Sequence, residues 1–203
     1  AGGSLKWFRD ALYGGETPQN DAYPRINKEI EAGAKDPTGL IFLPYMAGER
    51  APIWDPNARG TFMGLNMNTT RAEMLRAVME GTSFALQDNL DQAIKTGIPI
   101  RDFICCGGCS KSDIWLKIKA SVIGQEIKIP SVNLGAPGGL GYMNAAFMGE
   151  YKTPEDASRA ALQIKKIVEP VEEWIPIYKE LYQIYLDSYQ SLKSQFAALA
   201  QIK

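Results

Sequence analysis

The chain has 203 residues, of which 45% are hydrophobic and 22% are charged, and its formal net charge is −1. These values suit a globular protein with a sizeable buried core. The near-neutral charge argues against a nucleic-acid partner, and no apolar run is long enough to span a membrane. We therefore expect a cytoplasmic protein that binds neither nucleic acid nor a membrane.

The chain contains three cysteines and no histidine. Catalytic triads and dyads that use an imidazole base are therefore excluded, and proton transfer would need a carboxylate, lysine, tyrosine or cysteine. A zinc site is not expected either, because no histidine ligand is available. Cys105, Cys106 and Cys109 are expected to be buried, reduced thiols.

Short helices and strands alternate in the first third of the chain. Leu5, Phe8 and Leu12 recur at helical spacing and predict the first helix, which Gly14 and Gly15 end. In chain order, we expect a helix over 1–14, a loop over 15–25, a short helix over 24–34, and strands over 40–45 and 61–65.

A long helix follows the second strand. Thr70 and Glu73 have the spacing of a capping box at its start, and Gly97 with Pro99 marks its end. Its predicted apolar face consists of Leu75, Val78, Met79, Ala85, Leu86, Leu90 and Ile94.

Residues 103–129 are the most informative segment of the chain. Their pattern predicts a buried strand, a tight turn at Gly107-Gly108, an amphipathic helix, a stop at Gly124 and a second strand. Glycines between a strand and a helix let a flat ligand lie against bare backbone, and the helix start favours anions. That geometry suits a nucleotide. Residues 107–112 alone, however, are more typical of a tight connection with a serine cap.

The last third of the chain is mainly helical. A glycine loop over 134–148 is predicted to enter a closely packed helix of small residues, and Thr153 with Pro154 predicts another helix start. A long helix over 171–201 carries an aromatic stripe, which we expect to pack within the chain, a homodimer face being the alternative. Strands alternating with helices indicate an α/β protein.

Several single residues have a functional and a structural interpretation, and we favour the structural one for each. Glu49 and Arg50 are expected to have a structural rather than a catalytic role, and Asp55 is expected to belong to an Asp-Pro turn. Trp115 is expected to pack in the core, with stacking on adenine as the alternative.

Four ordered segments together resemble the FGGY family of carbohydrate kinases, in particular its xylulose-kinase-like branch. Gly107-Gly108-x-Ser-x-Ser112-x-x-Trp115, followed by Gly124, resembles the adenosine loop of that family. The other matching segments are 42–52, 59–65 with Glu80-Gly81 downstream, and 135–149.

The resemblance implies an actin-like ATPase, or ribonuclease H-like, fold. Residues 1–203 would be the second, C-terminal, nucleotide-side domain of a two-domain sugar kinase, incomplete at its N-terminal edge. The implied reaction transfers the γ-phosphoryl group of ATP, with Mg²⁺, to a hydroxyl of xylulose or a related ketose or polyol. The implied partners are therefore ATP or ADP and a sugar bound by the first domain.

The resemblance also assigns nucleotide-binding residues. Gly108 and Ser112 lie where the family contacts adenosine, Gly107 lies in the same turn, and Ser110 completes the predicted site. Cys109 replaces a glycine or alanine, so its side chain is expected to point away from the base. No catalytic or metal-binding residue is assigned within the chain.

In the resembled family, the general-base aspartate and the loop that grips the ATP phosphates precede the segment matching 3–13. We therefore expect a fragment of a longer chain that is inactive alone and that self-associates or is marginally stable. Two other functions stay open: a non-catalytic adenine-nucleotide-binding or assembly module of the same fold, and a different α/β enzyme such as a dehydrogenase. The second is disfavoured, because the glycine motif lacks a third glycine and a later acidic ribose partner.

Overall fold

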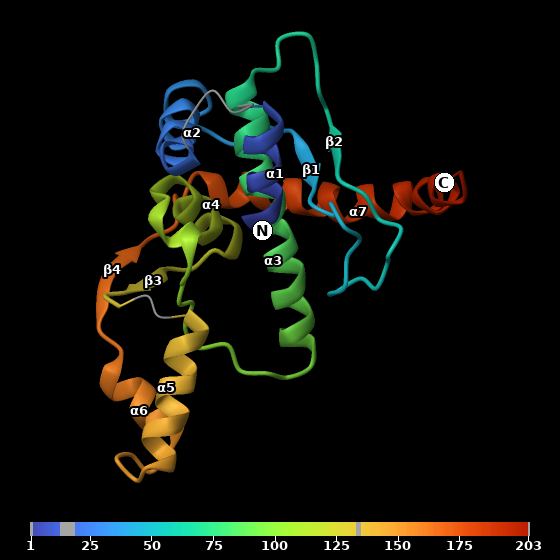
Figure 1. Ribbon diagram of the computed structural model, residues 1–203. Helices are drawn as coiled ribbons and strands as arrows, with labels where there is room; N and C mark the ends of the chain where they lie inside the picture. The colour runs from blue at the N-terminus through green and yellow to red at the C-terminus, as the bar shows by residue number, and fades with distance from the viewer. Residues whose placement is uncertain (1, 13–18, 133–134, 203) are drawn as a thin grey trace.

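The computed structural model describes residues 2–12, 19–132 and 135–202 and confirms an α/β protein (Figure 1). The first half contains α1 (Gly2–Leu12), α2 (Gln19–Gly33), β1 (Ile41–Leu43), β2 (Thr61–Met63) and α3 (Arg71–Lys95). The second half contains the 3₁₀ turn η1 (Gly108–Lys111), α4 (Asp113–Ile123), β3 (Ile127–Pro130), α5 (Gly135–Phe147), α6 (Pro154–Ala161), β4 (Ile164–Val168) and α7 (Trp174–Gln201).

The elements form a larger and a smaller region. In the larger region, α1, α2, α3, α4 and α7 share one hydrophobic core with the antiparallel pair β1–β2, and β1 packs against α3 and α7. In the smaller region, the antiparallel pair β3–β4 packs against α4, and the helices α5 and α6 extend away from it (Figure 1). None of the helices in the described part of the chain is long and apolar enough to cross a membrane.

The predicted first two helices are present, with shifted ends. The first begins at Gly2 and ends at Leu12, and the glycines expected to stop it lie outside the described residues. The second begins at Gln19, within the predicted loop, and contains Pro24. Complete burial of Ile26 and Ile30 stabilises α2 despite the proline.

Helix α3 starts with the predicted capping box. The Thr70 backbone N–H donates to the Glu73 carboxylate at 2.7 Å, and the Thr70 hydroxyl accepts from the Glu73 backbone N–H at 3.3 Å. The predicted apolar face is correct for the first half of the helix only. Leu86 is 43% exposed and Ile94 is 54% exposed, because α3 extends beyond the helices around its first half (Figure 1).

Gly81 allows α3 to lie directly against β1. A Cβ atom at this position would be 2.0 Å from the carbonyl oxygen of Phe42, in the fully buried strand β1. No side chain fits at that distance without movement of the backbone. The close contact between α3 and β1 therefore depends on glycine.

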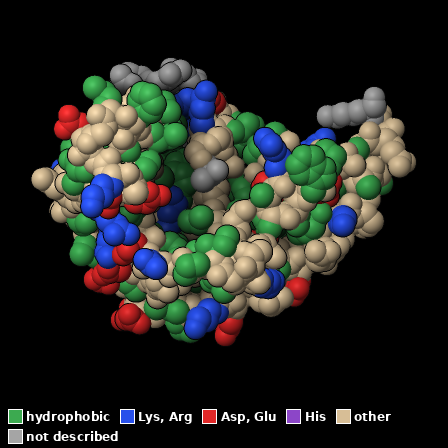
Figure 2. Space-filling view, turned by 90° about the horizontal axis from the view of Figure 1, so that it is seen from below, with side chains coloured by type: hydrophobic (Ala, Val, Ile, Leu, Met, Phe, Trp, Pro, Cys, Tyr) green, Lys and Arg blue, Asp and Glu red, His purple; other side chains and the backbone are tan. Residues whose placement is uncertain are grey.

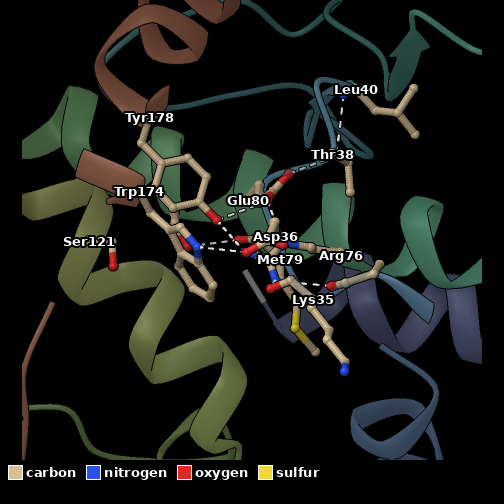
Figure 3. Close-up of polar contacts among 12 residues, drawn as sticks. Lys35, Asp36, Thr38, Leu40, Arg76, Met79, Glu80, Ser121, Trp174 and Tyr178 are labelled. Carbon is tan, nitrogen blue, oxygen red and sulfur yellow. Dashed lines mark hydrogen bonds and ion pairs between the residues drawn. The ribbon is translucent and has the colours of Figure 1, made fainter. Parts of the chain in front are cut away.

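A fully buried ion pair fixes α3 to its neighbours (Figure 3). The Arg76 guanidinium donates to the Glu80 carboxylate at 2.7 Å, and neither side chain is exposed. Arg76 also donates to the carbonyl oxygens of Ala34 and Lys35, at 3.1 and 2.7 Å. The buried positive charge of Arg76 is therefore balanced by a carboxylate and by the carbonyl oxygens that accept its hydrogen bonds.

Helix α7 joins the same network. The Tyr178 hydroxyl accepts from Arg76 at 2.8 Å and donates to Glu80 at 2.9 Å. The Arg76 guanidinium lies 4.3 Å from the ring centroid of Trp174. Burial, followed by the negative charge of Glu80, raises the pKa of the Tyr178 hydroxyl, so it stays protonated and can donate.

The aromatic stripe of α7 packs within the chain, as predicted. The Tyr185 hydroxyl lies 2.8 Å from the Tyr45 hydroxyl, and the Tyr189 hydroxyl donates to the Asp55 carboxylate at 2.9 Å. These bonds join α7 to the residue before the turn over 46–56 and to a residue near the end of that turn. The remaining stripe residues are Trp174, Tyr178 and Tyr182.

The prediction of a buried strand before the glycine turn is wrong. Residues 103–105 make only one parallel bridge, between Ile104 and Lys128 of β3, and Ile104 is 44% exposed. The segment pairs with β3 on one side, and no described strand pairs with its other side. Burial on both faces, which the apolar sequence predicted, is therefore absent from this part of the structure.

The helix rich in small residues, α5, is also less buried than predicted. It packs against α6, and Gly138 is its one fully buried residue among those described. Leu140, Met143 and Phe147 are 63%, 59% and 92% exposed. Figure 2 views the molecule from the end formed by α5 and α6, and hydrophobic side chains lie there between charged ones around a central hollow.

We predict that Gly81→Ala lowers the free energy of unfolding by about 2–3 kcal/mol, because the new methyl group forces α3 away from β1. Urea denaturation measures the change. Gly3→Ala is the control, because a Cβ atom there meets no described atom within 4 Å, and alanine favours the helix. Equal stability of the two variants would contradict the packing argument.

We predict that Glu80→Gln lowers the free energy of unfolding by about 3–5 kcal/mol, because it leaves the buried Arg76 charge without a counter-charge. Lys166→Gln is the control. It removes an ion pair with Asp113 whose side chains are 46% and 63% exposed, and it should cost less than about 1 kcal/mol. A loss under about 1 kcal/mol for Glu80→Gln would show that the buried pair contributes little.

Candidate functional site

The candidate site is the turn that joins the segment paired with β3 to helix α4. Gly107 has φ +85°, in the region where glycine is strongly favoured, and the 3₁₀ turn Gly108–Lys111 follows it. Helix α4 then begins at Asp113 and ends at Ile123, and Gly124, with φ +73°, caps its end. The predicted order of glycine turn, helix, glycine stop and strand β3 is confirmed.

Ser112 fixes the start of α4. Its hydroxyl accepts from the Trp115 backbone N–H at 3.3 Å and donates to the Asn27 side-chain oxygen at 2.8 Å. Ser112 is 7% exposed, so both bonds lie away from solvent. The serine cap is therefore present, and it also ties the loop to α2.

Gly107 and Gly108 are exposed and face open space. A Cβ atom built on either residue would have no described atom within 4 Å, apart from its own neighbours in the chain. Packing within the described chain therefore does not require glycine at 108. An empty volume beside bare backbone is the geometry that a flat ligand needs.

The other loop residues have different roles. The Ser110 hydroxyl donates to the Gly107 carbonyl oxygen at 2.7 Å and so closes the turn on itself. The Lys111 side chain is exposed. Trp115 is 4% exposed in the main core, which confirms the prediction that it packs there and excludes stacking on a ligand in this conformation.

The cysteines are less buried than predicted. All three are free thiols, but Cys106 is exposed and Cys105 and Cys109 are only half-buried. The Sγ atoms of Cys105 and Cys109 lie 3.4 Å apart. The sequence contains a signal that the predictions above did not use, because Cys106-Gly-Gly-Cys109 has the Cys-x-x-Cys spacing typical of reactive thiols.

A cavity of about 280 Å³ lies beside the segment that leads into the turn. Ile104 and Cys106 line it on one side, and Gly135, Gly138 and Tyr142 of α5 line it on another. A second cavity, of about 340 Å³, lies between α3 and α7, where Asp88 and Asp91 belong to its lining. Burial raises the pKa of the Asp88 carboxyl.

The polar turn before β2 is structural. The Glu49 carboxylate accepts from the backbone N–H groups of Arg50 and Ala51, at 2.7 and 3.3 Å. Burial opposes ionisation of Asp55, but hydrogen bonds from Asn57 and Tyr189 lower its pKa overall. Asp55 therefore holds the predicted Asp-Pro turn as a carboxylate.

No group of three or more Cys, Asp or Glu side chains in the described part of the chain could hold a metal ion. The Asp113 carboxylate, in the first turn of α4, accepts from Lys166 at 2.8 Å. It is therefore engaged by a lysine of β4.

Residues 1–150 match the family model described as the FGGY family of carbohydrate kinases, C-terminal domain. A xylulose kinase of Staphylococcus epidermidis is 30% identical over 202 residues, which is 100% of this chain and 40% of the relative. The chain thus spans about 40% of the length of the curated relatives it matches.

Solved structures show the same relationship. A xylulose kinase from Rhodospirillum rubrum matches with a TM-score of 0.82 and 25% identity, over 97% of this chain and 39% of that one. A gluconate kinase from Lactobacillus acidophilus matches with a TM-score of 0.84 and 28% identity, over 98% and 39%. The fold of this chain is therefore found within sugar kinases of more than one kind.

We predict that Ser112→Ala lowers the free energy of unfolding by about 1–2 kcal/mol, because the cap of α4 and the bond to Asn27 are both lost. Thermal or urea unfolding measures the change. Ser191→Ala is the control, because that exposed hydroxyl only donates to the Asp187 carbonyl within α7. A stable Ser112→Ala variant would show that the cap does not hold the loop.

Proposed function

The chain belongs to the FGGY family of carbohydrate kinases, and from this premise we propose that it supplies the nucleotide-binding side of an ATP-dependent sugar kinase. In the proposed reaction, the sugar hydroxyl attacks the γ-phosphorus of ATP, and ADP leaves. The observation that supports the proposal most directly is the open glycine turn at the start of α4.

Gly107 and Gly108 are the residues we propose to lie against adenosine. Their backbone is exposed, and a side chain at 108 would occupy the open volume that a ligand needs. Ser110 and Ser112 also belong to the proposed site. Because both hydroxyls already bond within the protein, we infer that these serines mainly hold the loop in shape.

The substrate we propose is xylulose or a related ketose or polyol, because the chain is similar to xylulose kinases along its whole length. Kinases of this kind use ATP with a divalent metal ion, which stabilises the charge on the phosphates. We propose no residue of this chain as a magnesium ligand.

We assign no catalytic base to this chain either. The acidic residue closest in sequence to the loop, Asp113, is paired with Lys166. Phosphoryl transfer depends on positioning both substrates, and the residues proposed here contact only the nucleotide. We therefore expect the 203-residue chain alone to lack sugar-kinase activity.

A non-catalytic nucleotide-binding or assembly module is the second candidate, and the lack of an assignable base among the described residues favours it. The dehydrogenase alternative is not kept, because the family match covers the glycine turn itself. A sugar-dependent turnover of ATP by a longer protein containing this chain would separate the kinase from the module.

We predict that Gly108→Val weakens ADP binding by at least about tenfold in calorimetric titration, because the side chain fills the proposed adenosine volume. The folded state should be retained, since a Cβ atom at position 108 meets no described atom within 4 Å. Gly3→Val is the matched control, at an equally open position on α1. Equal ADP affinity of both variants would contradict the proposed site.

A further inference from the structure

Two sulfur atoms face each other across the glycine turn. Sγ of Cys105 lies 3.4 Å from Sγ of Cys109, and Gly107 and Gly108 lie between the two residues in the sequence. A disulfide bond is about 2.05 Å long, so the sulfurs would need to approach by about 1.4 Å. The intervening glycines can adapt their backbone at low steric cost. The pair is therefore well placed for an intramolecular disulfide.

The two thiols differ in acidity. The hydrogen bond from Cys105 and the positive charge of Lys119 lower the pKa of the Cys109 thiol, although burial opposes ionisation. The same hydrogen bond, together with burial, raises the pKa of the Cys105 thiol. Because the thiolate is the reactive form, we expect the Cys109 sulfur to react first with an oxidant.

The charge of Lys119 is held in place by the core. Lys119 is 6% exposed, and its ammonium nitrogen lies 4.8 Å from the ring centroid of Trp115. Such a buried charge is little screened by solvent, so it acts on nearby sulfur more strongly than a surface lysine would.

We propose that Cys105 and Cys109 are an oxidation site, at which hydrogen peroxide forms a reversible disulfide across the glycine turn. The Cys109 thiolate attacks one peroxide oxygen, the O–O bond breaks, and a sulfenic acid and one water form after protonation. The Cys105 thiol then attacks the sulfenic sulfur; the S–S bond forms, the S–O bond breaks, and a second water leaves with the Cys105 proton. Two thiols are oxidised and one peroxide is reduced to two waters.

Cys106 provides the matched control. Its Cys-x-x-Cys spacing makes it the partner of Cys109 that the sequence would suggest. In the structure, however, the Cys109 Sγ atom contacts the backbone carbonyl oxygen of Cys106, at 3.7 Å. Cys106→Ser therefore removes an exposed thiol from the same loop and keeps the facing pair.

The experiment treats the reduced protein with a small excess of hydrogen peroxide, alkylates the remaining thiols and digests the product with trypsin. All three cysteines lie in one peptide, residues 102–111, between Arg101 and the cleavage after Lys111. For the wild type, we expect this peptide to lose two hydrogens and to carry one alkyl group, at Cys106. Cys106→Ser should lose the two hydrogens as well, whereas Cys105→Ser and Cys109→Ser should not.

Three alkylated cysteines in the peroxide-treated wild type would overturn the proposal. So would alkylation at Cys105 together with a Cys106–Cys109 bridge, which fragmentation of the peptide reveals. Fragmentation of the wild-type peptide decides between these outcomes even where a serine variant fails to fold. Treatment with dithiothreitol should restore three free thiols.

The effect on nucleotide binding rests on the proposed function. Because the disulfide draws Cys109 toward Cys105, it moves the 3₁₀ turn that presents Gly108. We expect oxidation to weaken ADP binding by about tenfold in the wild type and in Cys106→Ser, and not in Cys105→Ser. No ADP binding by the reduced protein would contradict the proposed nucleotide site and leave the disulfide result intact. Equal affinity of the oxidised and reduced protein would overturn the proposed effect.

Discussion

The structure depends on a buried charge that must be satisfied. Arg76 is fully buried on α3, and its guanidinium reaches Glu80 on the same helix, carbonyl oxygens of the segment before β1, and Tyr178 on α7 (Figure 3). An isolated buried charge would cost more than the fold could tolerate, so all three elements must be in place together. Gly81, which follows Glu80 on α3, allows the helix to approach the backbone of β1. Charge compensation and close packing therefore act at neighbouring positions of one helix.

A few hydrogen bonds attach the candidate site to the helices of the larger region. Ser112 joins the start of α4 to Asn27 of α2, and the Ser121 hydroxyl accepts from the backbone N–H of Val171 at 2.9 Å, just before α7. Helix α4 is thus fixed at its start and near its end, while the glycines before it stay exposed. A rigid helix preceded by open backbone is a suitable arrangement for binding a flat ligand without rearranging the core.

The incorrect predictions concern burial more than secondary structure. The run of apolar residues at 103–106 predicted a buried strand. Whether such a strand is buried depends on how many strands lie beside it, and the hydropathy of the segment does not give that number. Ile104 has one such neighbour, and Cys106 is consequently exposed. The second half of α3 and the outer face of α5 are exposed for a related reason, because the helical periodicity identifies an apolar face without identifying what covers it. The thiol pair was missed because Cys105 and Cys109 face each other only through the conformation of the turn.

The sequence alone determined the local structure and the family. The capping box at Thr70, the glycine turn, the serine cap and the glycine stop at Gly124 were all predicted, because each depends on the conformational preferences of a few adjacent residues. The order of four motifs was sufficient for the family, which the comparisons confirmed. Only the tertiary structure showed that Tyr178 bonds to the buried pair Arg76–Glu80, that Asn27 holds Ser112, and that the Cys105 sulfur faces Cys109. These contacts depend on how distant segments and the turn are placed in space, and no local propensity specifies that placement.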